Sequence, residues 1–328
     1  MLHASSSSSS STSSKKSTIV RSPSALRIAR AALQAAFLVS DELGAGFAER
    51  LFTTPTRHPR PAREQTVLAT ARPFHVDAPL RSPRWTGHVA RVAAWRWGHG
   101  PTALLVHGWE GRGSQLGAVV EPLVAAGMSV VAFDAPGHGS SPGTRLYLTD
   151  LADTIAAVAA ASGPLHALIA HSFGSAATLL AQERNGLEAP RTVMLAPNVL
   201  LDESITQFAR TIALDAADRA LFEASLADHA GVAAGALTLD RLVGARDTQL
   251  LVIHDRDDRE VAVAQGERLA ARWPGAELVI TEGLGHRRIL RDPAVIARVV
   301  EFARHGVRPP ASDLVREVDR CLARGEDL

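Results

Sequence analysis

Residues 165–181 are LHALIAHSFGSAATLLA, in which one serine stands between an apolar run and a helical pattern. The run 165–169 predicts a buried strand, and the segment after Gly174 predicts a packed helix. The turn between them is sharp, so the residues two before and two after Ser172 must be small, and they are Ala170 and Gly174. Such a turn presents Ser172 beside the N–H groups of a helix N-terminus. Alone the pattern indicates only a tight turn, so its meaning depends on the rest of the chain.

Length, charge and cysteine content limit the classes of protein to which this chain can belong. The chain has 328 residues, 46% hydrophobic and 21% charged, enough for one large α/β domain with additions or for two smaller domains. Because 35 basic side chains balance 34 acidic ones to a net charge of +1, we expect no nucleic-acid partner. One cysteine, Cys321, excludes an internal disulfide, and its helical spacing to Val318 predicts a packed thiol. A reducing, cytoplasmic location is compatible with this content and is expected.

The first forty residues differ from the rest of the chain. A serine tract at 5–14 cannot bury apolar surface, so we expect residues 1–23 to be a disordered tail. A helical pattern covers 24–51, and a Pro-rich connector completes an N-terminal segment 24–63. Three interpretations of the helix stay open: a helix docked on the main domain, a targeting peptide, or a membrane-surface helix. The apolar run 31–39 is too short to span a bilayer, and no transmembrane helix is expected.

Beyond the connector, short apolar runs alternate with helical patterns. The runs predict strands at 89–97, 102–107, 129–133, 165–170, 192–196, 249–254 and 277–281. The patterns between them predict helices at 114–126, 148–161, 175–184, 261–272 and 293–305. Most runs are continuous in Val, Ile, Leu and Ala, as in strands covered on both faces. The sequence therefore predicts an α/β fold, a mostly parallel central sheet flanked by helices, with its chemistry at the carboxyl ends of the strands.

Residues 197–245 interrupt this alternation. No strand-like run occurs there, whereas Ile205, Phe208 and Ile212 recur at roughly helical spacing. A helical insertion between two strands predicts a lid over the site, and an ordinary crossover that runs long is the alternative. The predicted core is therefore 64–196 together with 246–328, with 197–245 as a helical lid or cap.

Two glycine-rich turns follow predicted strands. The first begins His-Gly-Trp at 107–109, and such a turn lets backbone N–H groups approach a ligand closely. The N–H groups of Trp109 and Phe173 are thus the expected pair for an oxyanion hole. The turn lacks the Gly-Lys-Ser/Thr ending of a phosphate loop. The second turn contains Asp134 and His138, which we expect to stabilise the turn itself.

A serine hydroxyl is a weak nucleophile, so it needs a base to take its proton and a carboxylate to orient the base. The last two predicted strands each end in a candidate. Asp258 follows the first of them, with Asp257 as a competitor, and His286 follows the second. The chain order is then Ser172, Asp258, His286. No paired-cysteine or His-Glu-x-x-His spacing predicts a metal site.

Taken together, these motifs resemble the α/β-hydrolase fold family over roughly residues 89–305. In that family the oxyanion turn begins His-Gly-x, as here, and the serine turn is Gly-x-Ser-x-Gly, here with Ala170 in place of the first glycine. In the family, the acid is the aspartate of a His-Gly-x-x-Asp pattern after a strand, and this aspartate corresponds to Asp258. Asp255 stands where the family usually has glycine. The family's base follows a glycine after the last core strand, and this base corresponds to His286.

The resemblance implies a serine hydrolase, a probable carboxylesterase in family terms, that cleaves an ester through an acyl-enzyme. Ser172 would be the nucleophile, His286 the base and Asp258 the acid, with the N–H groups of Trp109 and Phe173 as oxyanion hole. No cofactor or metal is implied, and the expected partner is a small-molecule ester or acyl substrate. An acyltransferase, a thioesterase or an amidase on the same residues, or a non-catalytic binding module, are the alternatives. The sequence sets neither the acyl chain nor the oligomeric state.

Overall fold

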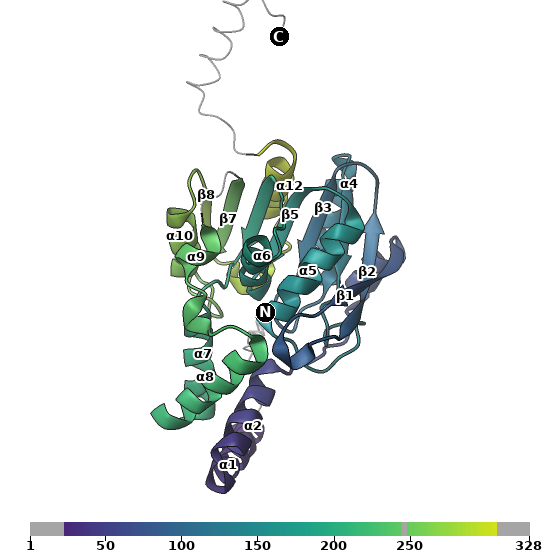
Figure 1. The fold of residues 1–328 in the computed structure, drawn as a ribbon. Coiled ribbons are helices and arrows are strands. Elements are labelled where there is room, and N and C mark those ends of the chain that lie inside the picture. Colours follow the sequence, from purple (N-terminus) through teal and green to yellow (C-terminus); the bar gives the residue numbers. More distant parts are fainter. Residues whose placement is uncertain (1–22, 245–247, 307–328) are drawn as a thin grey trace, which may run out of the picture.

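The central sheet organises the molecule, which is described for residues 23–244 and 248–306 of a computed structural model. Within those residues the sheet has eight strands in the order β1-β2-β4-β3-β5-β6-β7-β8. The strands are β1 (Arg72–Pro79), β2 (Val89–Trp97), β3 (Thr102–Val106), β4 (Ser129–Phe133), β5 (Leu165–His171), β6 (Arg191–Leu195), β7 (Gln249–Asp255) and β8 (Glu277–Thr281). Strand β2 runs antiparallel to β1 and β4, and the other pairings are parallel. The prediction of a mostly parallel sheet is confirmed (Figure 1).

The strands in the middle of the sheet are apolar because both of their faces are covered. Every residue of β3 and of β4 is buried. All seven strands expected from the sequence are present, each within one residue at either end. The sequence missed β1, an edge strand that pairs with β2 and buries only Val76 and Ala78. Its pattern lacks the continuous apolar run from which the other strands were predicted.

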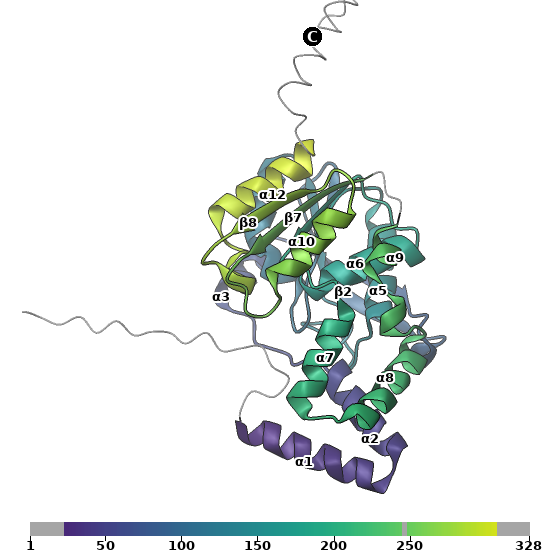
Figure 2. The same cartoon turned by 90° about the vertical axis from the view of Figure 1, so that its left-hand side faces the viewer.

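Helices cover the two faces of the sheet, as Figures 1 and 2 show. One face is covered by α5 (Leu148–Ser162), α6 (Phe173–Arg184) and α10 (Val263–Arg272). The other is covered by the 3₁₀ helix η2 (Gly113–Val119), α4 (Val120–Ala125) and α12 (Pro293–His305). Alternate side chains of one strand serve the two faces: Leu104 of β3 packs in the first apolar cluster and Leu105 in the second. The chain therefore has two core layers, one on either side of the sheet.

The N-terminal segment forms two helices where the sequence predicted one. These are α1 (Pro23–Val39) and α2 (Asp41–Thr53), which pack together as a hairpin. The break falls at Ser40, whose Oγ accepts a hydrogen bond from Leu43 N at 3.1 Å. A serine in this position satisfies a free N–H group at the start of α2, so a new helix begins there. A third helix, α3 (Ala62–Ala69), begins inside the predicted Pro-rich connector.

The interval between β6 and β7 contains helices and, in its described residues, no strand. It holds α7 (Leu201–Ile212), α8 (Ala216–Ala230), the 3₁₀ turn η3 (Ala234–Ala236) and α9 (Leu239–Val243). Figure 2 shows α7 and α8 beside the α1–α2 hairpin at one end of the sheet. Phe52 of α2 joins them, because its ring lies 4.9 Å from that of Phe208 and 5.6 Å from that of Phe222. These four helices therefore share one small apolar core.

Some expectations concern residues that the structure does not describe. The serine tract at 5–14, nearly all of the tail 1–23 and the predicted packing of Cys321 lie outside the described residues. Among the helices that are described, none is both long enough and apolar enough to cross a bilayer.

Candidate active site

Ser172 occupies the turn between β5 and α6. Its backbone has φ 54° and ψ −126°, a combination that residues with a Cβ rarely adopt and that stores strain at functional turns. Small neighbours make this turn possible. A Cβ added to Gly174 would lie 2.6 Å from the carbonyl oxygen of His107, and Ala170 has no exposed surface. Helix α6 begins directly after Ser172, so the serine stands at a helix N-terminus.

Two hydrogen bonds join Ser172 to distant parts of the chain. His286 Nε2 lies 2.9 Å from Ser172 Oγ, and His286 Nδ1 lies 2.7 Å from Asp258 Oδ2. Asp258 follows β7, and His286 belongs to the short helix α11 (Gly285–Arg288) that follows β8. Ser172 and His286 are each 8% exposed. The structure thus brings together the three residues that the sequence singled out as nucleophile, base and acid.

Asp258 is the carboxylate that contacts His286. Burial raises the pKa of Asp258, but hydrogen bonds from His254 and His286 outweigh it and hold the pKa well below its ordinary value. The Asp258 carboxylate is therefore ionised at neutral pH. Its competitor Asp257 has a different contact: its Oδ2 accepts a hydrogen bond from Gly283 N at 2.9 Å.

Asp255 links the loop of Asp258 to the loop of His286. Its side chain is fully buried and accepts hydrogen bonds from Asp257 N at 3.0 Å, Gly285 N at 2.8 Å, Leu284 N at 3.0 Å and Thr281 Oγ1 at 2.8 Å. These bonds hold the residue before His286 against the loop that carries Asp258. Sequence reasoning registered Asp255 only as a departure from the family pattern. A carboxylate at a position that is usually glycine was the signal for this role.

His171 supports the backbone of His286. Its Nε2 lies 3.0 Å from the carbonyl oxygen of His286, and the two rings are 4.7 Å apart. Burial, and then the neighbouring His286, place the pKa of His171 well below its ordinary value. The neutral ring therefore donates from Nε2 to that carbonyl. Because His171 directly precedes Ser172, one strand end positions both the serine and the histidine.

Trp109 and Phe173 flank Ser172. Phe173 is the first residue of α6, where backbone N–H groups have no partner inside the helix. The loop of Trp109 closely approaches the serine, since a Cβ added to Gly108 would lie 2.8 Å from Ser172 Cβ. The Trp109 and Phe173 rings pack edge to face, 5.7 Å apart. The two residues expected to form an oxyanion hole thus lie close to each other and to Ser172.

Two buried histidines hold the loop after β3 as uncharged rings. His107 Nε2 accepts a hydrogen bond from Ala135 N at 2.9 Å, while its Nδ1 lies 2.8 Å from Gly108 O. His138 Nε2 accepts from Glu110 N at 3.2 Å. Burial lowers the pKa of His107 to about 4 and that of His138 to about 3, so both are neutral at pH 7. They connect the loop after β3 to the loop after β4.

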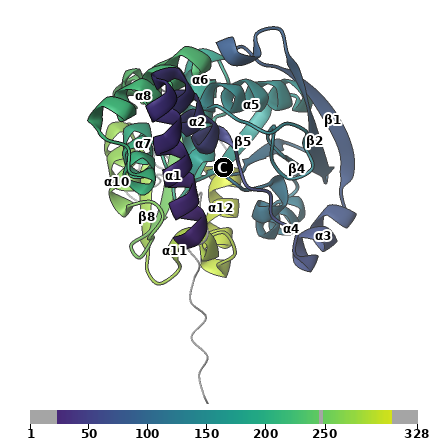
Figure 3. The same ribbon diagram turned by 90° about the horizontal axis from the view of Figure 1, so that it is seen from below.

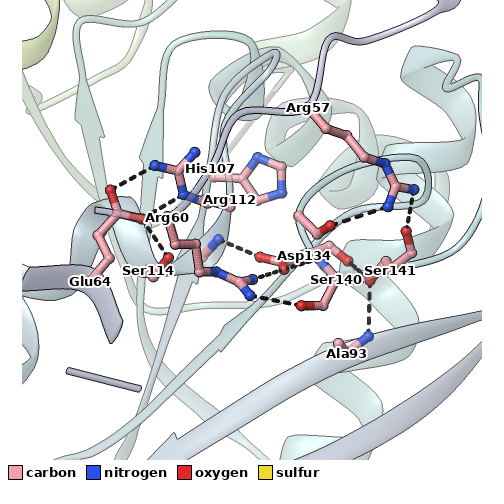
Figure 4. A network of polar contacts seen from close by, with 12 residues as sticks. Arg57, Arg60, Glu64, Ala93, His107, Arg112, Ser114, Asp134, Ser140 and Ser141 are labelled. Carbon is pink, nitrogen blue, oxygen red and sulfur yellow. Dashed lines mark hydrogen bonds and ion pairs between the residues drawn. The ribbon is translucent and has the colours of Figure 1, made fainter. Parts of the chain in front are cut away.

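The connector between α2 and α3, together with Glu64 of α3, fastens the same loops, as Figure 4 shows. Arg57 donates hydrogen bonds to four carbonyl groups of the loop after β4, those of Gly137, Gly139, Ser141 and Gly143. Glu64 binds Arg112 Nε at 2.5 Å and Nη2 at 2.9 Å, and accepts from Ser114 Oγ at 2.7 Å. The Arg112 and Glu64 side chains are each 5% exposed, so this ion pair is shielded from solvent. Arg57 of the Pro-rich connector thus fastens the loop after β4, and Glu64 of α3, just beyond the connector, supports the loop of Trp109.

Asp134 belongs to this network rather than to the contacts of Ser172. Its carboxylate pairs with Arg60 and accepts hydrogen bonds from Gly113 N at 2.8 Å and Ser140 N at 2.7 Å. Burial raises the pKa of Asp134. These contacts agree with the turn role expected from the sequence, and they extend it to the start of η2.

A cleft of about 2030 Å³ opens over Ser172, which is larger than the roughly 300–1,000 Å³ of ordinary small-molecule pockets. Trp109, Phe173 and His286 line it near the serine. Helices α2, α7 and α8 add apolar side chains to its wall: Phe52, Ile205, Phe208 and Leu226. In residues 23–244 and 248–306, no group of three or more His, Cys, Asp and Glu is arranged to hold a metal ion.

The chain is similar to known proteins over most of its length. A model of the Alpha/beta hydrolase family matches residues 103–299. An esterase from Pyrococcus furiosus superposes with a TM-score of 0.56 at 18% identity, over 77% of this chain and 97% of that one. An esterase from Rhodococcus sp. ECU1013 superposes with a TM-score of 0.53 at 21% identity, over 73% of this chain and 100% of that one. A bromoperoxidase from Bacillus anthracis superposes with a TM-score of 0.52 at 14% identity, over 71% of this chain and 99% of that one. No curated protein matches the chain. At these identities, the solved structures establish similarity of fold alone.

Proposed function

The chain belongs to the alpha/beta hydrolase family and has its fold, and from this premise we propose that it is a serine esterase whose nucleophile is Ser172. One observation carries the proposal: Ser172 Oγ, His286 and Asp258 form a continuous hydrogen-bonded line with distances of 2.9 and 2.7 Å. A hydroxyl, an imidazole and a carboxylate in this order are a nucleophile, its general base and the group that orients the base.

In the proposed acylation step, Ser172 Oγ attacks the acyl carbon of the ester while His286 Nε2 takes the hydroxyl proton. Asp258 accepts the hydrogen bond of Nδ1–H, which selects the tautomer with a free Nε2 and stabilises the imidazolium that forms. The ionised state of Asp258, favoured by its lowered pKa, suits this role. The N–H groups of Trp109 and Phe173 bind the oxygen of the tetrahedral intermediate, and each such donor is typically worth about 2.7–4 kcal/mol.

Collapse of the intermediate breaks the bond to the alcohol, and His286 gives its proton to the leaving oxygen. The acyl group is then esterified to Ser172. Water, deprotonated by the same Nε2, attacks this acyl-enzyme, and the acid leaves as Ser172 recovers its proton. The cycle needs no cofactor.

The ester bond and the cap are further parts of the proposal. Two of the structural neighbours named above are esterases and the third is a bromoperoxidase, so the fold alone does not select the substrate. The apolar wall that α7 and α8 contribute to the cleft suits an acyl chain. We assign residues 197–245, which include these helices, as the cap over the acyl site.

Removal of the nucleophile or of the base tests the proposal. Ser172→Ala and His286→Ala should each lower kcat for p-nitrophenyl acetate by about a millionfold. The first variant lacks the oxygen that attacks the ester, and the second lacks the base that takes the proton from this oxygen. Ser175→Ala is the matched control, since Ser175 lies one helical turn away in α6 and is also buried. Its activity should be retained.

A fluorophosphonate probe distinguishes a catalyst from a binding module. The probe should label Ser172 in the wild-type protein and in Ser175→Ala, and should not label Ser172→Ala. Retained turnover in a folded Ser172→Ala variant would refute the assignment. A folded wild-type protein that neither reacts with the probe nor cleaves esters would support the non-catalytic alternative.

A further inference from the structure

Helix α1 is held against the rest of the molecule in a fixed orientation. Leu33 on its inner side is 2% exposed and packs in the apolar cluster shared with α7 and α8. Arg30 donates two hydrogen bonds to the carbonyl oxygen of Thr211 in α7, at 3.0 and 2.7 Å. The opposite side of α1 therefore faces away from the protein.

The outward side of α1 is apolar. Among the described residues, six large hydrophobic side chains are exposed, and four of them belong to the hairpin: Ile28 at 70%, Leu38 at 89%, Val39 at 73% and Leu43 at 56%. The remaining two, Val89 and Leu278, lie elsewhere, on β2 and β8. Clustering on one short hairpin separates these four from the single exposed apolar residues that every protein has.

Helical geometry turns this cluster into a continuous surface. Residues three, four and seven apart share a helix face, so Ile28, Ala31, Ala35 and Leu38 form one row, and all four are exposed. Val39 and Leu43 extend the row at the end of the hairpin. Figures 2 and 3 place α1 outside α2 and α7, at the outer end of the molecule. We call Ile28, Ala31, Ala35, Leu38, Val39 and Leu43 the outer face.

The sequence that leads into the outer face is basic. Residues 1–40 carry five basic side chains, Lys15, Lys16, Arg21, Arg27 and Arg30, and no Asp or Glu. The first acids, Asp41 and Glu42, come at the start of α2. An apolar row that follows a basic stretch of sequence, with the exposed Arg27 beside it, suits a surface that offers both hydrocarbon and negative charge.

We propose that the outer face docks on the surface of an anionic phospholipid bilayer. The apolar row enters the boundary between headgroups and acyl chains, and Arg27, which is exposed beside the row, meets the anionic headgroups. The hairpin also contributes to the cleft, since Phe52 of α2 lines it together with Phe208 of α7. Docking would thus bring the cleft close to lipid-dissolved esters, a consequence that rests on the proposed function, whereas the docking itself does not.

Co-sedimentation with vesicles tests the docking. The full-length protein should sediment with vesicles of phosphatidylcholine mixed with phosphatidylglycerol, and less with phosphatidylcholine alone. The triple variant Ile28→Ser, Leu38→Ser, Val39→Ser should lower binding to the mixed vesicles by about tenfold or more, because three inserted side chains are lost. Cleavage of soluble p-nitrophenyl acetate should not change, which separates this test from that of the catalytic residues.

Two further variants make the test specific. Val89→Ser with Leu278→Ser removes two exposed apolar side chains outside the hairpin and should leave vesicle binding unchanged. Lys15→Gln, Lys16→Gln and Arg21→Gln together should reduce the preference for anionic vesicles, and added salt should have the same effect.

Three outcomes would overturn the proposal. The first is absence of wild-type binding to both kinds of vesicle. The second is an equal loss of binding in the Val89 and Leu278 control. The third is a wild-type dimer in light scattering that the triple variant dissociates, because the outer face would then be covered by a second copy.

Discussion

At the scale of single residues, Asp257 and Asp258 are neighbours with different contacts. Asp258 Oδ2 lies 2.7 Å from His286 Nδ1, whereas Asp257 accepts a hydrogen bond from Gly283 N. Spacing alone left these two residues in competition as the acid. The side-chain contact to His286 distinguishes them, and it favours Asp258.

Exchange of each carboxylate for an amide tests this distinction. Asp258→Asn should lower kcat by about 10,000-fold, because an amide no longer selects the tautomer with a free Nε2 on His286. Asp257→Asn is the matched control and should change kcat little, since an amide oxygen still accepts from Gly283 N. Steady-state kinetics with p-nitrophenyl acetate measure both. A large loss in Asp257→Asn with normal turnover in Asp258→Asn would reverse the assignment.

Residues whose role depends on one local motif could be predicted, and residues whose role depends on a distant contact could not. Ser172 and His286 each follow a strand with small neighbours, which is visible in a few consecutive letters. Asp255 and His171 act through hydrogen bonds to the loop of His286, some thirty and 115 residues further on. No periodicity in the sequence reports such a contact.

At the scale of elements, the N-terminus of α5 contains a carboxyl group with a perturbed pKa. Asp150 is 1% exposed and accepts hydrogen bonds from Ser82 Oγ at 2.6 Å and from Tyr147 N at 3.2 Å. Burial raises the pKa of Asp150 from its ordinary 3.8 to about 6. The folded protein therefore binds this proton more tightly than the unfolded chain does.

The sign of the pH dependence follows from this difference. Because the pKa of Asp150 is higher in the folded protein, its protonation contributes to the free energy of unfolding. This contribution is fully present below the unfolded-state pKa of 3.8 and is lost as the pH rises through about 6. The difference between the two values corresponds to about 3 kcal/mol. The free energy of unfolding of the wild type should thus fall by about 2 kcal/mol relative to Asp150→Asn between pH 4 and pH 7, because part of the contribution is already lost at pH 4. Denaturant titrations of both proteins measure the free energy of unfolding at each pH. If this free energy changed with pH equally in wild type and Asp150→Asn, the prediction would be wrong.

Elements with a strong periodic pattern could be predicted, and elements defined by their neighbours could not. The apolar runs of β3 and β4 are buried on both faces, so their sequences alone indicate strands. Strand β1 has no such run because it lies at the edge of the sheet. The division into α1 and α2 depends on one capping side chain, Ser40, which interrupts an otherwise continuous helical pattern.

At the scale of the whole molecule, Glu49 connects the hairpin to the core and to α8. Its side chain is buried and binds the hydroxyl of Tyr147, which precedes α5. It also accepts from Ser225 Oγ at 2.5 Å and lies 2.8 Å from His229 Nδ1, both in α8. Arg145 adds an ion pair at 3.6 Å. One carboxylate thus joins three parts of the chain that are far apart in sequence.

Loss of this carboxylate should destabilise the whole protein. Glu49→Ala leaves the buried hydroxyl of Tyr147 and the largely buried Arg145 without their acceptor. Loss of a buried partner of this kind typically costs about 3–5 kcal/mol, and should lower Tm by about 10 °C. Glu42→Ala, on an exposed position of the same helix, is the matched control and should leave Tm nearly unchanged. Differential scanning calorimetry measures both. Equal Tm values for wild type and Glu49→Ala would show that the hairpin is not coupled to the core through this residue.

The sequence by itself determined seven of the eight described strands, the helical layers and the four motifs of the candidate site, because strand and helix periodicity and sharp turns leave local patterns in the chain. Only the tertiary structure decided which carboxylate meets His286, how Asp255 and the Arg112–Glu64 pair support the site, and that one side of α1 faces outward. These features depend on contacts between residues far apart in the chain. Such contacts form only when the apolar faces of separate elements pack together, so they leave no local pattern.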